Sequence, residues 1–369
     1  MSFDPHHVLS FFMMTKLVYI LTCAPESHYI EQALMAIWSA RYHNPEAHIV
    51  LLTDDKTDLL LTGTRGELTK YVTEKIVVPF EDESLSMMYR SRWIKTSVRE
   101  LIAGNFMFID CDTLVCRSLS DVDSFECEVG AVLESHLLVE DFGHGLRKAA
   151  TEANRRIGVD LNAEKEYFSS GVLYVKDTPQ THSLYHLWHE CWLESFQLGL
   201  PIDQPSLAKS NREVGHIVQK IPDTYNCILF TQNSFTDKAH ILHIASFRNP
   251  CFLFTEEVFN LLKNEGLVGW VKECLLHPCD SFLPFDYVVR HSTRKERVNW
   301  RKSIASTSET IRENLPGLID KFPMQSSMRG IVCWLFRHRF HKLGALVWMS
   351  WKRMQVLRKQ GLKENICQN

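Results

Sequence analysis

The sequence lacks the features that mark several protein classes. Its 11 cysteines include no Cys-x-x-Cys pair and are odd in number, which argues against a zinc knot and against a secreted disulfide scaffold. No apolar stretch is long enough to span a bilayer. The short apolar segment at residues 8–14 has no Lys or Arg ahead of it, so we do not expect a signal peptide. These absences predict a cytoplasmic protein.

Acidic residues are scarce at the C-terminal end of the chain. Residues 328–369 hold nine Lys or Arg and one acid, Glu364, for a net charge of +8, whereas the rest of the chain carries −11. Trp334, Trp348 and Trp351 alternate with the basic clusters. This pattern is typical of a helix lying on an anionic membrane, and it predicts a peripheral protein on the inner face. Packing of these aromatic residues on the folded domain is the alternative. A nucleic-acid partner is not expected, because only the tail is basic.

The order of apolar segments predicts an α/β fold. A strand at 17–22, a helix at 29–41 and a strand at 48–54 form a βαβ unit, which predicts parallel pairing. The polar segment 136–167 is either a helical excursion or a lid over a site. Further strands are expected at 76–78, 129–133 and 172–175. Further helices are expected at 68–75, 85–103, 181–197, 255–264 and 269–276.

A pair of acidic residues behind a predicted strand is the most informative feature of the chain. Four apolar residues, 106–109, predict a strand covered on both faces, and Asp110 and Asp112 follow it directly. The spacing alone is common by chance, and Asp121 and Asp123 repeat it without a preceding strand. What distinguishes the first pair is its position at a strand end, where α/β sheets bind ligands. Two carboxylates at that edge predict a divalent-cation site.

Three further patches follow this pair along the chain. They are Phe-Ser-Ser-Gly-Val at 168–172, the dipeptide Asp203-Gln204, and a segment from His243 to Pro250. Together with the strand leading into Asp-x-Asp, they resemble the motifs of GT-A fold glycosyltransferases. The resemblance is closest to glycosyltransferase family 8, the group of glycogenin and the bacterial lipooligosaccharide galactosyltransferases, and covers about residues 17–254. It implies a GT-A fold, that is, a Rossmann-like mixed sheet flanked by helices. In this chain a helical, basic C-terminal extension would come after that fold.

The resemblance also suggests how the chain is divided. Residues 16–254 would form the domain that binds the nucleotide sugar and carries catalysis. A short N-terminal extension would precede it at 1–15, a helical part would follow at 255–327, and the basic membrane-associating tail would close the chain at 328–369.

Each residue that matches a family motif acquires an implied role. Asp110, Asp112 and His243 would hold Mn²⁺ or Mg²⁺, and an imidazole beside two carboxylates suits Mn²⁺ better. Asp203 and Gln204 would be catalytic. Asp203 would bind hydroxyls of the donor sugar, and Gln204 would support the sugar cation on the face opposite the departing diphosphate.

Basic residues ahead of the acidic strand complete the implied donor site. Arg92 and Lys95 lie one turn apart on the predicted helix and would clamp phosphate or the donor sugar, with Arg92 also in a catalytic role. A solvated helix face is the alternative for both. The residues implied in contact with a UDP-sugar are Thr22, Ala24, Arg92, Lys95, Asp110, Cys111, Ser170, Gly171 and Arg248.

The chain departs from the family motifs at three positions. Ser169 stands where the family has Asn, Ser246 replaces a Gly, and Asn249 replaces the Lys before Pro250, so that Arg248 would take over the phosphate contact. These departures keep open a non-catalytic GT-A-like protein that binds a nucleotide or a glycan.

The function that the resemblance implies is a metal-dependent, retaining glycosyltransferase. It would move a hexose from a nucleotide sugar, expected to be a UDP-sugar, to a glycan acceptor such as a lipid-linked surface polysaccharide. An inverting transferase is the alternative within enzymes and would need a carboxylate base, for which Glu134, Glu140 and Asp141 are the candidates. The donor sugar, the acceptor, the linkage and the oligomeric state stay open.

Overall fold

The computed structural model describes residues 13–228, 238–244, 252–254, 256–276 and 278. All of them lie in the first of the two units into which the chain divides, Met1–Ser281 and Phe282–Asn369. The basic tail at 328–369 lies outside the described residues. So do most of residues 255–327, which are expected to be helical, and the motif residues Ser246, Arg248, Asn249 and Pro250.

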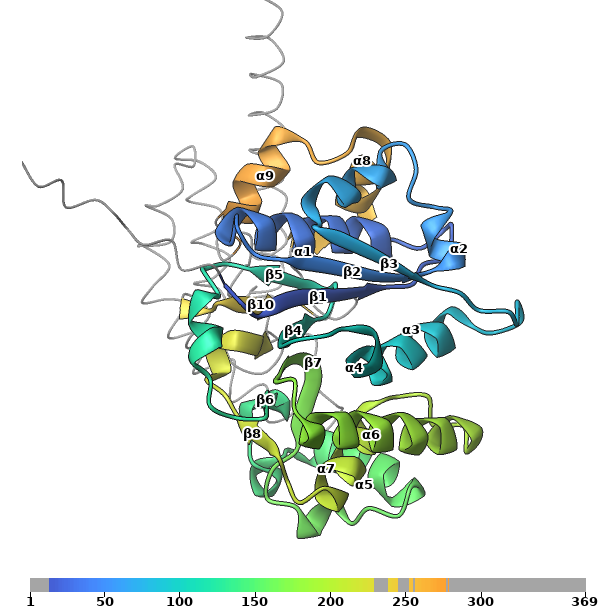
Figure 1. The fold of residues 1–369 in the computed structure, drawn as a ribbon, viewed down its shortest axis with the longest axis vertical. Helices are drawn as coiled ribbons and strands as arrows, with labels where there is room; N and C mark the ends of the chain where they lie inside the picture. Colours follow the sequence, from blue (N-terminus) through green and yellow to red (C-terminus); the bar gives the residue numbers. More distant parts are fainter. Residues whose placement is uncertain (1–12, 229–237, 245–251, 255, 277, 279–369) are drawn as a thin grey trace, which may run out of the picture. The chain divides into compact units, whose positions relative to one another are not determined.

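A seven-stranded mixed sheet is the centre of the described part of the chain (Figure 1). Its strand order is β3-β2-β1-β4-β7-β6-β8. Strands β3, β2, β1 and β4 run parallel, and β7 is antiparallel to both of its neighbours, β4 and β6. The strands are β1 (Lys16–Leu21), β2 (Ile49–Asp54), β3 (Glu74–Val78), β4 (Phe106–Ile109), β6 (Val129–Leu133), β7 (Phe168–Val175) and β8 (Val218–Lys220).

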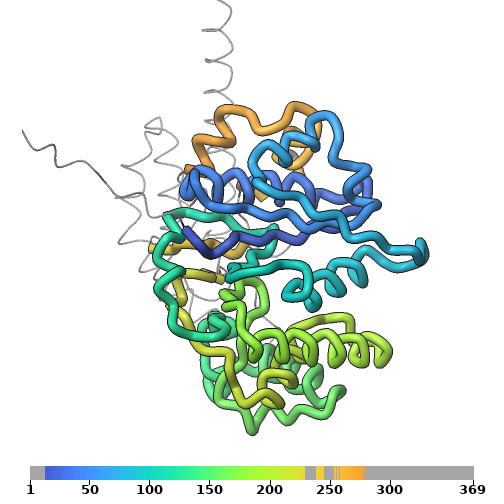
Figure 2. Tube along the Cα trace, viewed as in Figure 1, coloured from blue at the N-terminus to red at the C-terminus, as the bar shows by residue number. Residues whose placement is uncertain are grey.

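Helices cover both faces of this sheet (Figure 1). Helix α1 lies on one face, and α8 and α9, from the far end of the described chain, lie beside it (Figure 2). Helices α3, α4 and α6 lie on the other face, where α6 contacts both α3 and α4. The predicted α/β fold, a mixed sheet flanked by helices, is confirmed. The helices are α1 (Tyr29–His43), α2 (Asp55–Asp58), α3 (Met87–Thr96), α4 (Val98–Leu101), α5 (His144–Arg156), α6 (Pro179–Gln197), α7 (Gln204–Glu213), α8 (Glu256–Glu265) and α9 (Gly269–Leu276).

A second, three-stranded sheet with the order β5-β10-β9 lies beside the point where β4 ends. Its strands are β5 (Thr113–Val115), β9 (Cys227–Ile228) and β10 (Ile241–His243). Short 3₁₀ turns connect the elements, namely η1 (Arg65–Tyr71), η2 (Ser120–Ser124), η3 (Glu134–His136), η4 (Val139–Asp141), η5 (Leu161–Ala163), η6 (Asp223–Asn226) and η8 (Phe252–Phe254).

Most of the segments with strong periodicity form the element expected of them. All four residues of β4 are buried, as their unbroken apolar run predicts. The expected helix at 85–103 is two helices, because the chain breaks at Ser97, whose hydroxyl donates to the carbonyl of Trp93. The short helix expected at 68–75 is the 3₁₀ helix η1 (Arg65–Tyr71), which begins and ends earlier than expected because β3 starts at Glu74.

The polar segment at 136–167 is a helical excursion that contains η4, α5 and η5. A parallel sheet was expected from the first βαβ unit, but β7 pairs antiparallel with β4. Strand β7 also begins at Phe168, four residues before the expected start at 172. In the part of the chain that the structure describes, none of the helices combines the length and the apolar character needed to traverse a bilayer.

Candidate functional site

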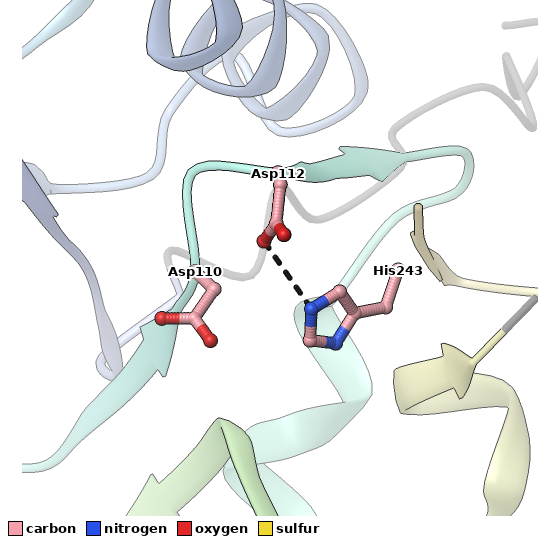
Figure 3. A group of neighbouring side chains, drawn as sticks. All are labelled: Asp110, Asp112 and His243. Carbon is pink, nitrogen blue, oxygen red and sulfur yellow. Dashed lines mark ion pairs between the residues drawn. The ribbon is translucent and has the colours of Figure 1, made fainter. Parts of the chain in front are cut away.

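The acidic pair lies in the turn between β4 and β5 (Figure 3). The backbone N–H of Asp110 donates to the carbonyl of Gly171 on β7 at 2.9 Å. The Thr113 hydroxyl donates to the carbonyl of Asp110 at 2.7 Å, which closes the turn on its other side. The backbone is therefore anchored to two strands, and both carboxylates project from one short, fixed segment.

His243 reaches the acidic pair through the second sheet. Strand β10 pairs antiparallel with β5, which sets His243 opposite Thr113. The N–H of Ile244 also donates to the carbonyl of Asp112 at 2.9 Å. As a result, Nε2 of His243 lies 3.2 Å from Oδ1 of Asp112, the contact drawn as a dashed line in Figure 3.

The three side chains can surround one ion. One ligand atom from each of Asp110, Asp112 and His243 lies within 4.8 Å of the other two. Divalent cations bind oxygen and nitrogen ligands at about 2.0–2.6 Å, so ligand atoms of a single ion lie up to roughly 5 Å apart. Carboxylate oxygens with one imidazole are a donor set that accepts divalent metals. The residues present therefore fit a divalent cation.

The charges in this cluster influence one another. Burial raises the pKa of the Asp110 carboxyl above its ordinary value, and Asp112 adds to the rise against the opposing effect of Lys95. Burial acts in the same direction on Asp112, but the charge and hydrogen bond of His243 outweigh it and leave the pKa of Asp112 below its ordinary value. Burial would lower the pKa of His243, yet its partner Asp112 keeps that pKa raised.

A second charged cluster borders the first one. Nζ of Lys95 lies 3.1 Å from Oδ2 of Asp203 and 3.6 Å from Oδ1 of Asp110, so it joins the two clusters. It also donates to the Ser170 hydroxyl at 3.3 Å and lies over the ring of Phe108. Since only 3% of the Lys95 side chain is exposed, these partners account for a buried ammonium group that would otherwise be costly.

Asp203 receives a second cation from the same helix. Nε of Arg92 lies 2.9 Å from Oδ1 of Asp203, with the Arg92 side chain 32% exposed. Burial would raise the pKa of Asp203, but Lys95 and Arg92 hold that pKa below its usual range, which keeps the carboxylate ionised. The indole N–H of Trp188 donates to the carbonyl of Asp203 at 2.9 Å and so fixes the backbone where α7 begins.

The side chain of Gln204 has a defined orientation. Its amide nitrogen donates to Oε2 of Glu134 at 2.9 Å and to the carbonyl of Phe168 at 2.7 Å. Both amide hydrogens are used in this way, so the amide oxygen points away from these partners. Glu134 precedes Ser135 and His136, two residues in the left-handed region at φ 56° and 61°. Glu140 and Asp141 lie on η4, exposed to solvent.

The remaining predicted donor residues lie at the end of the neighbouring strand. Thr22 and Ala24 follow β1, which pairs with β4. The Cys111 thiol donates to the carbonyl of Ile20 at 3.3 Å, so the acidic turn and the end of β1 meet at one edge of the sheet. Of the predicted donor-binding residues, Arg248 alone lies outside the described residues.

Three supporting residues were not predicted in these roles. Arg65 donates to the carbonyls of Pro25 and Ser27 and pairs with the buried Glu31. These contacts anchor the loop that follows β1. Glu134, considered only as a base, orients Gln204, and Asn226 contacts His243. A single Arg, Glu or Asn in an unremarkable stretch carries no local signal of this kind.

Comparison with known proteins identifies similar folds only among solved structures. No protein-family model matches the sequence, and no curated protein matches it. One similar structure is the galactosyltransferase LgtC in complex with donor and acceptor sugar analogs, at 14% identity, covering 78% of this chain and 100% of LgtC with a TM-score of 0.44. Mouse xyloside xylosyltransferase 1 covers 62% of this chain and 97% of its own at 14% identity and a TM-score of 0.40. The glycosyltransferase GlyE of Streptococcus pneumoniae covers 73% of this chain and 63% of its own at 15% identity and a TM-score of 0.41.

Proposed function

We propose that this protein is a metal-dependent glycosyltransferase that moves a hexose from a nucleotide sugar, specifically a UDP-sugar, to a glycan acceptor. The observation that carries the proposal is the convergence of Asp110, Asp112 and His243 beside the buried pair Lys95 and Asp203. One strand end thus offers ligands for a cation and, next to them, groups that can hold a polar sugar.

Asp110, Asp112 and His243 would hold Mn²⁺ or Mg²⁺, which when bound would neutralise negative charge on the diphosphate of the donor. The carboxylate of Asp203, kept ionised by its two cations, would accept hydrogen bonds from the sugar hydroxyls. Arg92 is the more exposed of those cations and would contact the donor from the open side of the cluster.

Gln204 supports the retaining form of the reaction. With its amide hydrogens bound by Glu134 and by Phe168, its oxygen is the atom that would face a donor sugar held by Asp203. A neutral carbonyl dipole there would stabilise positive charge as the diphosphate departs from the opposite face. The same contacts disfavour Glu134 as the base of an inverting reaction, because its carboxylate already accepts the amide of Gln204.

One observation favours a second function, the binding of a nucleotide or glycan without catalysis. Ser169, which stands where the family motif has Asn, accepts a hydrogen bond from Asn226 inside the protein. A donor contact expected of that Asn would therefore be absent, and the chain would then be a non-catalytic protein that binds a nucleotide or glycan. The basic tail at 328–369 would attach either kind of protein to an anionic membrane, near a lipid-linked acceptor.

The test of the proposed function is hydrolysis of nucleotide sugars by the protein in the absence of a glycan acceptor. The full chain is incubated with Mn²⁺ and each of several UDP-sugars, and UDP release is measured with and without excess chelator. We expect release from one donor, lost on chelation. Asp123→Asn alters the second Asp-x-Asp pair, on η2, where the carboxylate accepts from the N–H groups of Met14 and Thr15. It is the control for a lost structural carboxylate outside the cluster and should still hydrolyse the donor. Nucleotide binding without release from any donor would reject the transferase in favour of the binding protein.

A further inference from the structure

His243 contacts a fully buried amide on the side of its ring away from Asp112. Nδ1 of His243 lies 3.0 Å from Oδ1 of Asn226, and the exposed fraction of Asn226 is 0%. Asn226 lies on η6, directly before β9, and β9 pairs with β10, the strand that carries His243. The contact is thus built into the second sheet, and Asn226 is not among the residues that the family motifs mark.

The other end of the amide fixes which atom faces His243. Nδ2 of Asn226 donates to the Ser169 hydroxyl on β7 at 3.2 Å. With the NH₂ group bound there, the oxygen is the atom that faces the imidazole. A carbonyl oxygen can only accept, so Nδ1 of His243 carries a hydrogen and donates it. In a neutral ring, Nε2 is then the nitrogen with the free lone pair, and Nε2 is the atom that faces Asp112.

The ring also packs against the backbone of β7. A Cβ atom at Gly171 would lie 2.3 Å from Cε1 and 2.8 Å from Nδ1 of His243, so the imidazole rests directly on the backbone of β7. The N–H of Gly171 donates to the Ser169 hydroxyl at 3.4 Å, which ties this surface to the partner of Asn226. The imidazole is consequently held by the contact with Asn226 and by the close backbone of Gly171.

We propose that Asn226, supported by Ser169, is a positioning residue that fixes the tautomer and orientation of His243 so that Nε2 can bind a divalent cation. This inference rests on the proposed metal site. Groups that accept the second N–H of a ligating histidine typically affect metal affinity by about 10–100-fold. The proposal also gives Ser169 a use, because its hydroxyl is the acceptor that keeps the Asn226 amide in one orientation.

The test compares Mn²⁺ affinity of full-length variants, measured by isothermal titration calorimetry or by the EPR signal of free Mn²⁺. Asn226→Ala should weaken binding by about 10–100-fold. Asn226→Asp keeps an oxygen acceptor, to which Ser169 can donate instead, and should restore affinity close to that of the unaltered protein. Asn154→Ala is the matched control, because Asn154 is equally buried but lies on α5, where it donates to the Ala150 carbonyl.

The outcomes separate this inference from the proposed function. An unaltered protein that binds no Mn²⁺ refutes the metal site itself. If the unaltered protein binds Mn²⁺, then equal affinity in Asn226→Ala, or an equal loss in Asn154→Ala, overturns the positioning role. If Asn226→Ala does not fold, Ser169→Ala is tested in its place. Weaker Mn²⁺ binding together with an altered ¹⁵N NMR signature of the His243 ring supports the positioning role. An unchanged ring signature and an unchanged Mn²⁺ affinity reject it.

Discussion

Gly171 provides the sharpest test of the cluster, because replacing it with alanine adds one atom at a known place. The new Cβ would lie 2.3 Å from Cε1 of His243 and 3.0 Å from Oδ2 of Asp110, so one methyl group would contact two of the three candidate ligands. Carbon atoms pack at about 3.5–4.0 Å, and the ring must therefore move by more than about 1 Å. Metal sites tolerate errors of only about 0.2 Å in ligand distance.

The expected effect follows from this mismatch. An imidazole displaced by that amount no longer shares an ion with Asp110 and Asp112, and we expect Mn²⁺ affinity to fall by at least about 100-fold, or about 2.7 kcal/mol. Overpacking should also destabilise the fold by about 1–3 kcal/mol. The loss of Mn²⁺ affinity tests the metal site, whereas the loss of stability is expected of any overpacked glycine in this sheet.

A matched glycine on the adjacent strand separates the two effects. A Cβ at Gly130 on β6 would lie 2.5 Å from the side chain of Ile221, a clash of similar size in the same sheet. Gly130→Ala should therefore be destabilised in urea unfolding yet bind Mn²⁺ normally by calorimetry. Normal Mn²⁺ affinity in Gly171→Ala would refute the reasoning, because the ring would then have room that the structure denies it.

Three further predictions address the charges and the tail. Asp112→Asn should abolish UDP release while its circular dichroism and melting temperature stay near those of the unaltered protein, and full turnover in this variant would contradict the metal mechanism. Lys95→Met leaves the buried Asp203 with Arg92 as its remaining cation and should cost about 3 kcal/mol in the free energy of unfolding. An unchanged urea midpoint would show that Lys95 does not stabilise the two carboxylates. Deletion of residues 328–369 should release the protein from anionic vesicles in a sedimentation assay without affecting transfer to a soluble acceptor, whereas equal binding with and without the tail would exclude its membrane role.

Local sequence patterns were sufficient for much of the framework. The alternation that predicts a strand, a helix and a strand at the N-terminal end corresponds to β1, α1 and β2, and helix α9 has the predicted bounds. The unbroken apolar run before Asp110 predicts the buried strand β4. These features depend on residues within a few turns of one another, where periodicity reports burial directly.

Elements with weaker local signals were recognised only in the structure. Strands β9 and β10 are two and three residues long, too short for a period to be read, and helix α7 has Pro205 in its first turn. The antiparallel direction of β7 is likewise absent from its own sequence. Strand direction depends on how the chain returns after β6, through the excursion that contains α5.

The site shows the same division. The sequence alone placed Asp110 and Asp112 at a strand end and, through the family motifs, drew attention to Asp203, Gln204 and His243. Only the tertiary structure decided that β10 aligns His243 with Thr113 and that Lys95 bridges Asp110 and Asp203. It also decided that His243 contacts Asn226 and that Gln204 contacts Glu134. Such contacts join residues 15 or more positions apart, and they form only when strand register and helix packing bring those residues to one edge of the sheet.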